Sequence, residues 1–144
     1  PEGVPGRPRA ATRDDRELLA DWTHDFSVEA LGESDREGAA AAVDRTLADP
    51  ASHALLWDDG GPVSLAAAVG PTPNGIRIVS VYTPPPLRGR GYAGACVAEL
   101  TARMLTRYRF CFLYADLANP TSNAIYQRLG YHPVGDAGTY VFSG

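Results

Sequence analysis

The sequence predicts a single α+β domain, in which helices flank a twisted and mainly antiparallel sheet that contains one β-α-β crossover. The chain has 144 residues, a length typical of one domain. Two helix-like segments come first, and three strand-like runs joined by turns follow them, an order typical of α+β proteins. A strand, a glycine-rich loop, a helix and another strand come next, and this order predicts the parallel crossover.

The composition is that of an ordinary globular protein and disfavours several classes of partner. Hydrophobic residues make up 44% of the chain and charged residues 21%. The formal net charge of −4 disfavours nucleic acid as a general partner, and the lack of a run of about 18 apolar residues disfavours a membrane span. We therefore expect a cytoplasmic protein with no nucleic-acid or membrane partner.

Lysine, cysteine and histidine each limit the chemistry further. All 13 basic residues are arginine, so no lysine can serve as a base or form a Schiff base. Cys96 and Cys111 lie in apolar segments, which predicts buried free thiols in a reducing compartment. The three histidines are scattered without ligand spacing, so no metal site is predicted.

The N-terminal end differs from the rest of the chain. Residues 1–8 are rich in proline and glycine and predict a linker, with the folded domain spanning residues 9–144. The chain opens at Pro1 rather than at methionine, which suggests a fragment of a longer protein with a preceding domain.

Two helices are predicted after a short strand over residues 9–12. Thr12 opens the first helix, with Asp15 as its capping-box partner. Ser34 and Glu37 form a second capping box, and its helix ends at Asp49-Pro50.

An antiparallel meander is predicted over residues 53–57, 62–70 and 76–83. Alternation in the last of these runs predicts one shared face for Ile76, Ile78, Ser80 and Tyr82.

The second half of the chain predicts two helices and three strands. A helix over residues 92–108 precedes an apolar run over 110–117, which predicts a strand covered on both faces. A short helix begins at Asn119-Pro120 and ends at Gly130. Two strands over residues 131–134 and 139–142 close the chain. An edge strand near this end suits pairing with a second copy, so a homodimer is one expectation.

The segment from Val81 to Ala93 reads as a strand, a proline-stiffened corner, a glycine-rich turn and a helix start. The first N–H groups of a helix have no partner within it, and the helix dipole adds positive charge there, which makes an anion site. Gly89 and Gly91 let the backbone approach a phosphate closely, and the side chains of Arg88 and Arg90 suit phosphate. These residues predict a diphosphate-bearing ligand held between Arg88 and Ala93.

A polar stripe lies on the short helix that follows. Asn119, Asn123 and Tyr126 are spaced four and three residues apart, so they share one face. Ser122 lies on a neighbouring, mostly apolar face. A polar stripe on an otherwise packed helix needs partners, and a ligand is one such partner.

The two motifs together resemble a known family. Arg88-x-x-Gly91-x-Ala93 resembles the acyl-CoA-binding signature of the GNAT superfamily of N-acetyltransferases. Residues 119–131, Asn-Pro-Thr-Ser-Asn-Ala-Ile-Tyr-Gln-Arg-Leu-Gly-Tyr, resemble a later motif of that family. The order of predicted elements is similar to the GNAT fold from about Arg9 to Phe142. The resemblance implies an acyltransferase domain that moves an acetyl group from acetyl-CoA to a primary amine of a small molecule or peptide.

The resemblance also implies roles for individual residues. Asn119 would hydrogen-bond the pantetheine arm of coenzyme A, Tyr126 would lie at the thioester sulfur, and Ser122 and Asn123 complete the expected cofactor-binding set on this helix. The backbone groups expected to pair with the pantetheine arm belong to Val81, Tyr82 and Thr83. The N–H groups expected to hold the pyrophosphate belong to Arg88, Gly89, Arg90, Gly91, Tyr92 and Ala93.

The expected reaction is direct attack of an amine on the acetyl thioester. A backbone N–H at Tyr82 or Thr83 is the candidate donor to the developing oxyanion. A thiol titrates near ~8.5 and a phenol near ~10, so Tyr126 is a candidate acid for the departing thiolate.

The base is the least determined part of the mechanism. The strand over residues 76–83 lacks the Glu that some members of the family place there. Asp116 is the nearest acidic candidate. His24, Asp25 and Glu29, or a water chain to bulk solvent, are the other possibilities.

Two other functions fit parts of the sequence. The chain suits a non-catalytic acyl-CoA-binding module of a larger protein, since it lacks both an initial methionine and the strand Glu. Residues 89–94 match G-x-G-x-x-G, the dinucleotide fingerprint, and Asp116 lies 22 positions beyond Gly94. Three prolines between the strand and the glycines argue against the dinucleotide fingerprint, which follows its strand directly.

Overall fold

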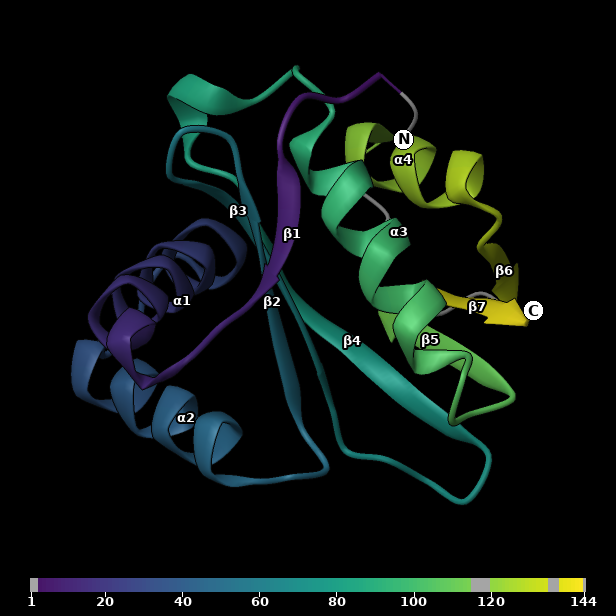
Figure 1. Cartoon of the computed structure of the whole chain (residues 1–144), viewed down its shortest axis with the longest axis horizontal. Coiled ribbons are helices and arrows are strands. Elements are labelled where there is room, and N and C mark those ends of the chain that lie inside the picture. The colour runs from purple at the N-terminus through teal and green to yellow at the C-terminus, as the bar shows by residue number, and fades with distance from the viewer. Residues whose placement is uncertain (1–2, 115–119, 135–137, 144) are drawn as a thin grey trace.

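The protein was analysed as a computed structural model that describes residues 3–114, 120–134 and 138–143 (Figure 1). The helices are α1 (Arg16–Leu31), α2 (Arg36–Ala48), α3 (Tyr92–Met104) and α4 (Pro120–Leu129), with short 3₁₀ turns η1 (Arg13–Asp15) and η2 (Pro85–Leu87). The strands are β1 (Arg7–Ala10), β2 (His53–Asp58), β3 (Pro62–Val69), β4 (Gly75–Tyr82), β5 (Phe110–Tyr114), β6 (His132–Val134) and β7 (Thr139–Ser143).

The strands form one mixed sheet in the order β1-β2-β3-β4-β5-β7-β6. Only β4 and β5 are parallel among the described neighbours, and α3 connects them. The predicted α+β class and its single crossover are therefore confirmed. A dinucleotide domain of the predicted kind needs a doubly wound parallel sheet, so this topology does not support that alternative.

Helices cover both faces of the sheet (Figure 1). On one face, α1 and α2 pack against β2, β3 and β4 through a small apolar cluster that includes Leu19, Trp22 and Tyr82. On the other face, α3 lies at the centre of a larger cluster that includes Val97 and Leu100, and side chains of α4 pack against its edge. The sheet thus separates two apolar cores, one beneath α1 and α2 and the other beneath α3.

The helix starts confirm one predicted cap and correct the other. Thr12 and Asp15 form the capping box, although the first turn is 3₁₀ rather than α. Asp35, not Ser34, caps α2, because its carboxylate accepts a hydrogen bond from the Glu37 N–H at 3.1 Å. A carboxylate at an N-terminus gains from the helix dipole as well as from the hydrogen bond.

A β-bulge overturns the predicted alternation in β4. The pairing of β4 with β3 shifts register between Leu65 and Ala67, and Ser80 has a φ of 54°. Because a bulge adds one residue to a strand, the side chains beyond it change face. Ile78 therefore belongs to the α3 cluster, whereas Tyr82 packs against Trp22 of α1.

The C-terminal half departs from prediction at two of its elements. The helix predicted to residue 108 ends at Met104. The described part of β5 alternates in burial, with Cys111 and Leu113 buried and Tyr114 exposed, so the two-sided cover predicted for it is wrong there. Gly130 ends α4 with a φ of 108°, as its place at a helix end predicted. The edge strand is β6, and its pairing with a second copy stays a prediction.

The segment predicted as a linker is packed against the domain from residue 4 onward. Val4 contacts the α3 cluster, and the Trp57 indole N–H donates a hydrogen bond to the Pro5 carbonyl at 2.8 Å. Strand β1 begins at Arg7, inside the predicted linker. Proline and glycine here shape a bent approach to the sheet rather than a solvated spacer. None of the described helices is long and apolar enough to span a membrane.

Candidate functional site

The backbone edge of β4 is the first part of the site. Strands β4 and β5 pair over only three residue pairs, from Gly75 with Phe110 to Arg77 with Phe112. Beyond Arg77 the two strands are no longer paired, although β4 continues to Tyr82. Within the described chain, no strand is hydrogen-bonded to this edge of the second half of β4. An extended ligand chain can therefore pair with it as an added strand does.

The bulge at Ser80 lies within this second half of β4, which pairs with β3 on its other edge. A serine at positive φ is uncommon, and such residues concentrate at functional sites. The Tyr82 carbonyl accepts a hydrogen bond from Ser64 Oγ at 3.1 Å, so it points toward β3. Because successive residues of a strand direct their backbone groups to opposite edges, we expect the groups of Val81 and Thr83 to face away from β3.

The glycine loop after β4 leads directly into α3. Gly89 and Gly91 have φ values of 82° and 87°, in the region that favours glycine. A Cβ added at Gly89 would meet no atom within 4 Å, so this part of the loop is open. Gly91 is the N-cap of α3, and the N–H groups of Tyr92 and Ala93 follow it. The loop therefore fits an anion at a helix N-terminus, as the sequence predicts.

The Arg88 side chain has partners that the sequence did not predict. Its Nη2 donates to both carboxylate oxygens of Glu29 on α1, at 2.7 and 2.8 Å, and its Nε donates to the Thr83 carbonyl at 2.7 Å. The guanidinium also lies 5.6 Å from the centre of the Tyr82 ring. The sequence predicted that this guanidinium faces a phosphate, but the structure ties it to α1 and to the end of β4.

A second carboxylate lies close to the loop. The Tyr92 ring is buried, and its hydroxyl donates a hydrogen bond of 2.5 Å to Asp59 in the turn between β2 and β3. This hydrogen bond is the main reason that the pKa of Tyr92 is raised. The contact anchors the first turn of α3 to the β2–β3 turn and so holds the loop in place.

Tyr126 lies on α4 and packs edge-on against two other tyrosines. Its ring centre is 6.2 Å from those of Tyr131 and Tyr140. Burial raises the pKa of Tyr126 to about 12. The phenol therefore stays protonated throughout the neutral range, as a proton donor requires.

The other predicted residues of this region are only partly described. Asn123 lies on α4, one turn before Tyr126, and its side chain is half-buried. Ser122 also lies on α4, but its side chain is outside the described part of the structure. Asp116 and Asn119 lie outside the described residues, so their roles stay predictions.

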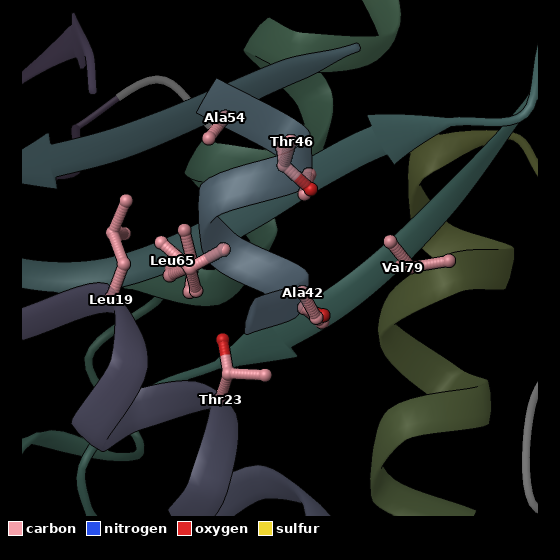
Figure 2. Close-up of a pocket in the computed structure, with 10 residues that line it drawn as sticks. Leu19, Thr23, Ala42, Thr46, Ala54, Leu65 and Val79 are labelled. Atoms are coloured by element: carbon pink, nitrogen blue, oxygen red, sulfur yellow. The ribbon is translucent and has the colours of Figure 1, made fainter. Parts of the chain in front are cut away.

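A small cavity lies on the other side of β4, beneath α1 and α2 (Figure 2). Its volume is about 50 Å³, and its wall includes Val79 and Ser80 of β4. Thr23 contributes from α1, and Ala42 and Thr46 contribute from α2. The bulge of β4 thus forms part of the cavity wall, in the half of the strand whose edge toward β5 is unpaired.

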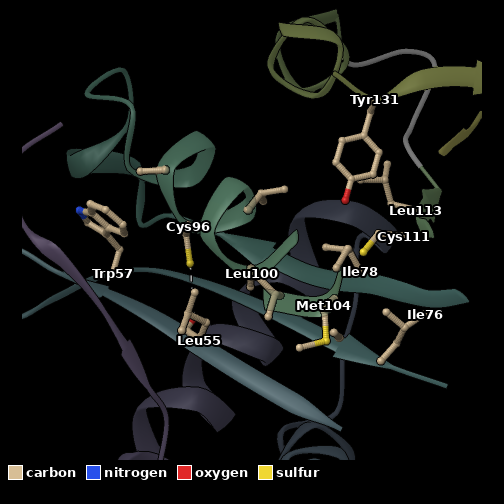
Figure 3. Close-up of a cluster of buried hydrophobic side chains, with 14 of the residues drawn as sticks. Leu55, Trp57, Ile76, Ile78, Cys96, Leu100, Met104, Cys111, Leu113 and Tyr131 are labelled. Carbon is tan, nitrogen blue, oxygen red and sulfur yellow. Dashed lines mark hydrogen bonds between the residues drawn. The ribbon is translucent and has the colours of Figure 1, made fainter. Parts of the chain in front are cut away.

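The two cysteines lie in the core cluster around α3 (Figure 3), and neither lines this cavity. Both are buried and free, as predicted. Cys96 donates a hydrogen bond to the Leu55 carbonyl at 3.4 Å. Burial raises the pKa to about 12 for Cys96 and to about 11 for Cys111. Neither thiol is an available nucleophile at neutral pH.

Several solved structures with a similar fold are acetyltransferases. Spermidine N-acetyltransferase from Vibrio cholerae, in complex with CoA and spermine, aligns with a TM-score of 0.74 at 13% identity, covering 94% of this chain and 90% of that one. A GNAT-family acetyltransferase from Staphylococcus aureus gives a TM-score of 0.76 at 9% identity, with coverage of 95% and 98%. An acetyltransferase from Thermus thermophilus gives 0.75 at 22% identity, with 97% of both chains covered. These likenesses extend to the fold, which is that of the GNAT acetyltransferases.

Comparison of the sequence with protein-family models identifies the family of the chain. A sequence model of the FR47-like protein family matches residues 59–140, more than half of the chain. The chain therefore belongs to the FR47-like family. The matched segment contains β3, β4, the glycine loop and α3. No curated protein sequence matches the chain.

Sequence reasoning missed the two carboxylates that hold the loop. Glu29 was one of several candidate bases, and Asp59 was only a turn residue. Their partners Arg88 and Tyr92 lie 59 and 33 positions away along the chain, and no local pattern links residues so far apart. Two acidic residues in an otherwise glycine-rich turn, Asp58-Asp59-Gly60-Gly61, were the only available signal for Asp59.

Proposed function

We propose that the protein is an acetyl-CoA-dependent N-acetyltransferase that moves an acetyl group to a primary amine. The observation that carries this proposal is the position of the glycine loop, which follows the half of β4 whose edge toward β5 is unpaired and which opens α3. A diphosphate at the loop and an extended arm along β4 would form one continuous ligand. The Vibrio cholerae enzyme with this fold is in complex with CoA, which supports the same cofactor here.

The residues present fit such a cofactor. The N–H groups from Arg88 to Ala93 would hold the pyrophosphate, since both loop glycines adopt the conformation that exposes the backbone. Val81 and Thr83 would hydrogen-bond the pantetheine arm along the edge of β4. Tyr82 lies between these two residues and would act on the arm only by holding them in position. Asn119, Ser122 and Asn123 would contact the arm from the side of α4.

Acetyl-CoA supplies an activated acyl group as a thioester. The Thr83 N–H is a better candidate than that of Tyr82 for donation to the carbonyl oxygen, because the Tyr82 carbonyl already points toward β3. The Tyr126 phenol, protonated at neutral pH, would donate its proton to the departing thiolate. Asp116 remains the proposed base.

Two measurements, made one after the other, test the proposal. Calorimetric titration should detect binding of acetyl-CoA but not of NADH, and thiol release from acetyl-CoA should then depend on an added amine. Binding of NADH alone would overturn the cofactor assignment. Binding of acetyl-CoA without thiol release from any primary amine would instead favour the non-catalytic acyl-CoA-binding module.

Replacing Glu29 by glutamine is expected to tighten acetyl-CoA binding roughly threefold at low salt. The glutamine carbonyl still accepts from Arg88, but a negative charge on the side of the proposed phosphate site is removed. Two exposed unit charges about 7 Å apart in water interact by about 0.6 kcal/mol. The gain should disappear at high ionic strength. Calorimetric titration at two salt concentrations measures it.

The matched control is Glu17→Gln, near the other end of α1. Glu17 also pairs with arginines, at 2.6 Å from Arg16 and 2.9 Å from Arg36. We expect no change in acetyl-CoA affinity there. Equal affinities of wild type and Glu29→Gln at low salt would show that Glu29 lies too far from the bound phosphates to affect them.

A further inference from the structure

The cavity beneath α1 and α2 has a wall without charge. Every residue that lines it is alanine, valine, leucine, serine or threonine. Figure 2 shows Leu19 and Thr23 on α1, Ala42 on α2, and Leu65 and Val79 on the strands around one space. Leu19 and Leu65 are each 2% exposed, so the floor of the cavity is part of the apolar core. The cavity therefore favours an uncharged group.

None of the charged residues of α1 and α2 lines this wall, and several of them form ion pairs elsewhere. Arg16 pairs with Asp44 at 2.6 Å, and Arg36 pairs with Asp21 at 3.0 Å. Glu29 is bound to Arg88. A cationic group placed in the cavity would meet no lining carboxylate, and burying an unpaired charge is costly.

The volume limits the size of the occupant. A water-sized group needs about 10–15 Å³, so the cavity of about 50 Å³ has room for about four such groups. That is the size of an isopropyl or hydroxyethyl group together with the carbon that bears it. The hydroxyls of Thr23, Thr46 and Ser80 suit an occupant that carries one hydroxyl as well as a purely aliphatic one.

We propose, on the basis of the function proposed above, that the acceptor is a primary amine whose α-carbon bears a short uncharged aliphatic or hydroxyalkyl group, which this cavity holds. The Ser80 end of the cavity lies at the half of β4 whose edge toward β5 is unpaired, along which the pantetheine arm would run. The amine nitrogen would then lie beside the thioester when the side group is seated. The neutral nitrogen forms a bond to the acetyl carbon and the C–S bond breaks. The thiolate takes a proton from the Tyr126 hydroxyl. The nitrogen releases a proton to solvent, and solvent returns one to the Tyr126 phenolate.

A panel of amino-acid amides tests the side group directly. At saturating acetyl-CoA, kcat/KM for L-valinamide and L-threoninamide should exceed that for glycinamide, L-lysinamide and L-tryptophanamide by at least ~tenfold, since each fitted methylene contributes substantially to discrimination. Glycinamide leaves the cavity empty, L-lysinamide brings a charge and L-tryptophanamide is too large. Spermidine completes the panel as a polyamine.

A cavity-filling variant ties the preference to this site. Ala42→Phe should lower kcat/KM for L-valinamide at least ~tenfold, change that for glycinamide much less, and leave acetyl-CoA affinity unchanged. Ala41→Phe is the matched control, because Ala41 is the preceding residue of the same helix and is exposed. It should behave as wild type with every amine.

The outcomes separate this inference from the proposed function. Fastest turnover of spermidine or L-lysinamide, with no effect of Ala42→Phe, would overturn the inference and leave the acetyltransferase proposal standing. Acetyl-CoA binding with no turnover of any amine would overturn both. The ranking of amines on the wild-type protein decides the question even if Ala42→Phe fails to fold.

Discussion

Replacing Gly91 by valine is expected to weaken acetyl-CoA binding at least ~tenfold, a loss of about 1.4 kcal/mol, while the protein stays folded. Gly91 has a φ of 87°, where a β-branched residue is a genuine outlier. The backbone would leave this conformation and turn the N–H groups of Tyr92 and Ala93 away from the ligand. Val4 adds a second obstacle, because a Cβ at Gly91 would lie 3.1 Å from Val4 Cγ2. Calorimetric titration measures the affinity.

Gly70→Val is the control for backbone strain. Gly70 has a φ of 62°, and a Cβ there would meet no atom within 4 Å. It follows β3, at the opposite end of β4 from the loop. Both variants should lose about 1–3 kcal/mol of unfolding free energy in chemical denaturation, but only Gly91→Val should lose affinity. Wild-type affinity in Gly91→Val would contradict the assignment of the loop to the pyrophosphate.

Replacing Tyr126 by phenylalanine is expected to lower kcat about 100-fold, the lower end of the range for a general acid. The ring contacts with Tyr131 and Tyr140 need no hydroxyl, so packing and the KM for acetyl-CoA should change little. Steady-state thiol release with the best amine of the panel measures both constants.

The pH dependence of this variant checks the role of the hydroxyl. Because burial raises the pKa of Tyr126 to about 12, the phenol remains a proton donor between about pH 6 and about pH 9. The ratio of wild-type to Tyr126→Phe activity should then be constant over that range. Tyr108→Phe, at a half-buried tyrosine beyond the C-terminus of α3, is the matched control and should retain wild-type kcat. Equal kcat in wild type and Tyr126→Phe would remove Tyr126 from the chemistry.

Local sequence signals predicted most of the elements. The capping box at Thr12, the turns around the meander and the glycine at the end of α4 each act through neighbouring residues, and each was confirmed. The glycine loop and its place before α3 were also predicted, because a strand, a proline-stiffened corner, two glycines and an amphipathic helix are neighbours along the chain.

Errors arose where distant residues decide the structure. The alternation of Ile78 and Tyr82 failed because the bulge at Ser80 depends on pairing with β3. The segment 4–8 read as a linker, yet it packs because Trp57 and the α3 cluster supply its contacts. Two-sided cover of β5 was inferred from an apolar run, but which strands and helices lie on each face is not encoded locally.

The sequence by itself determined the fold class, the crossover and the glycine loop before α3, since these follow from periodicity, capping and the conformational freedom of glycine over a few residues. Only the tertiary structure decided that Glu29 binds Arg88, that Asp59 holds Tyr92 and that an uncharged cavity adjoins Ser80. Each of these features joins segments far apart in the chain, and such contacts form only when the sheet and the helices pack against one another.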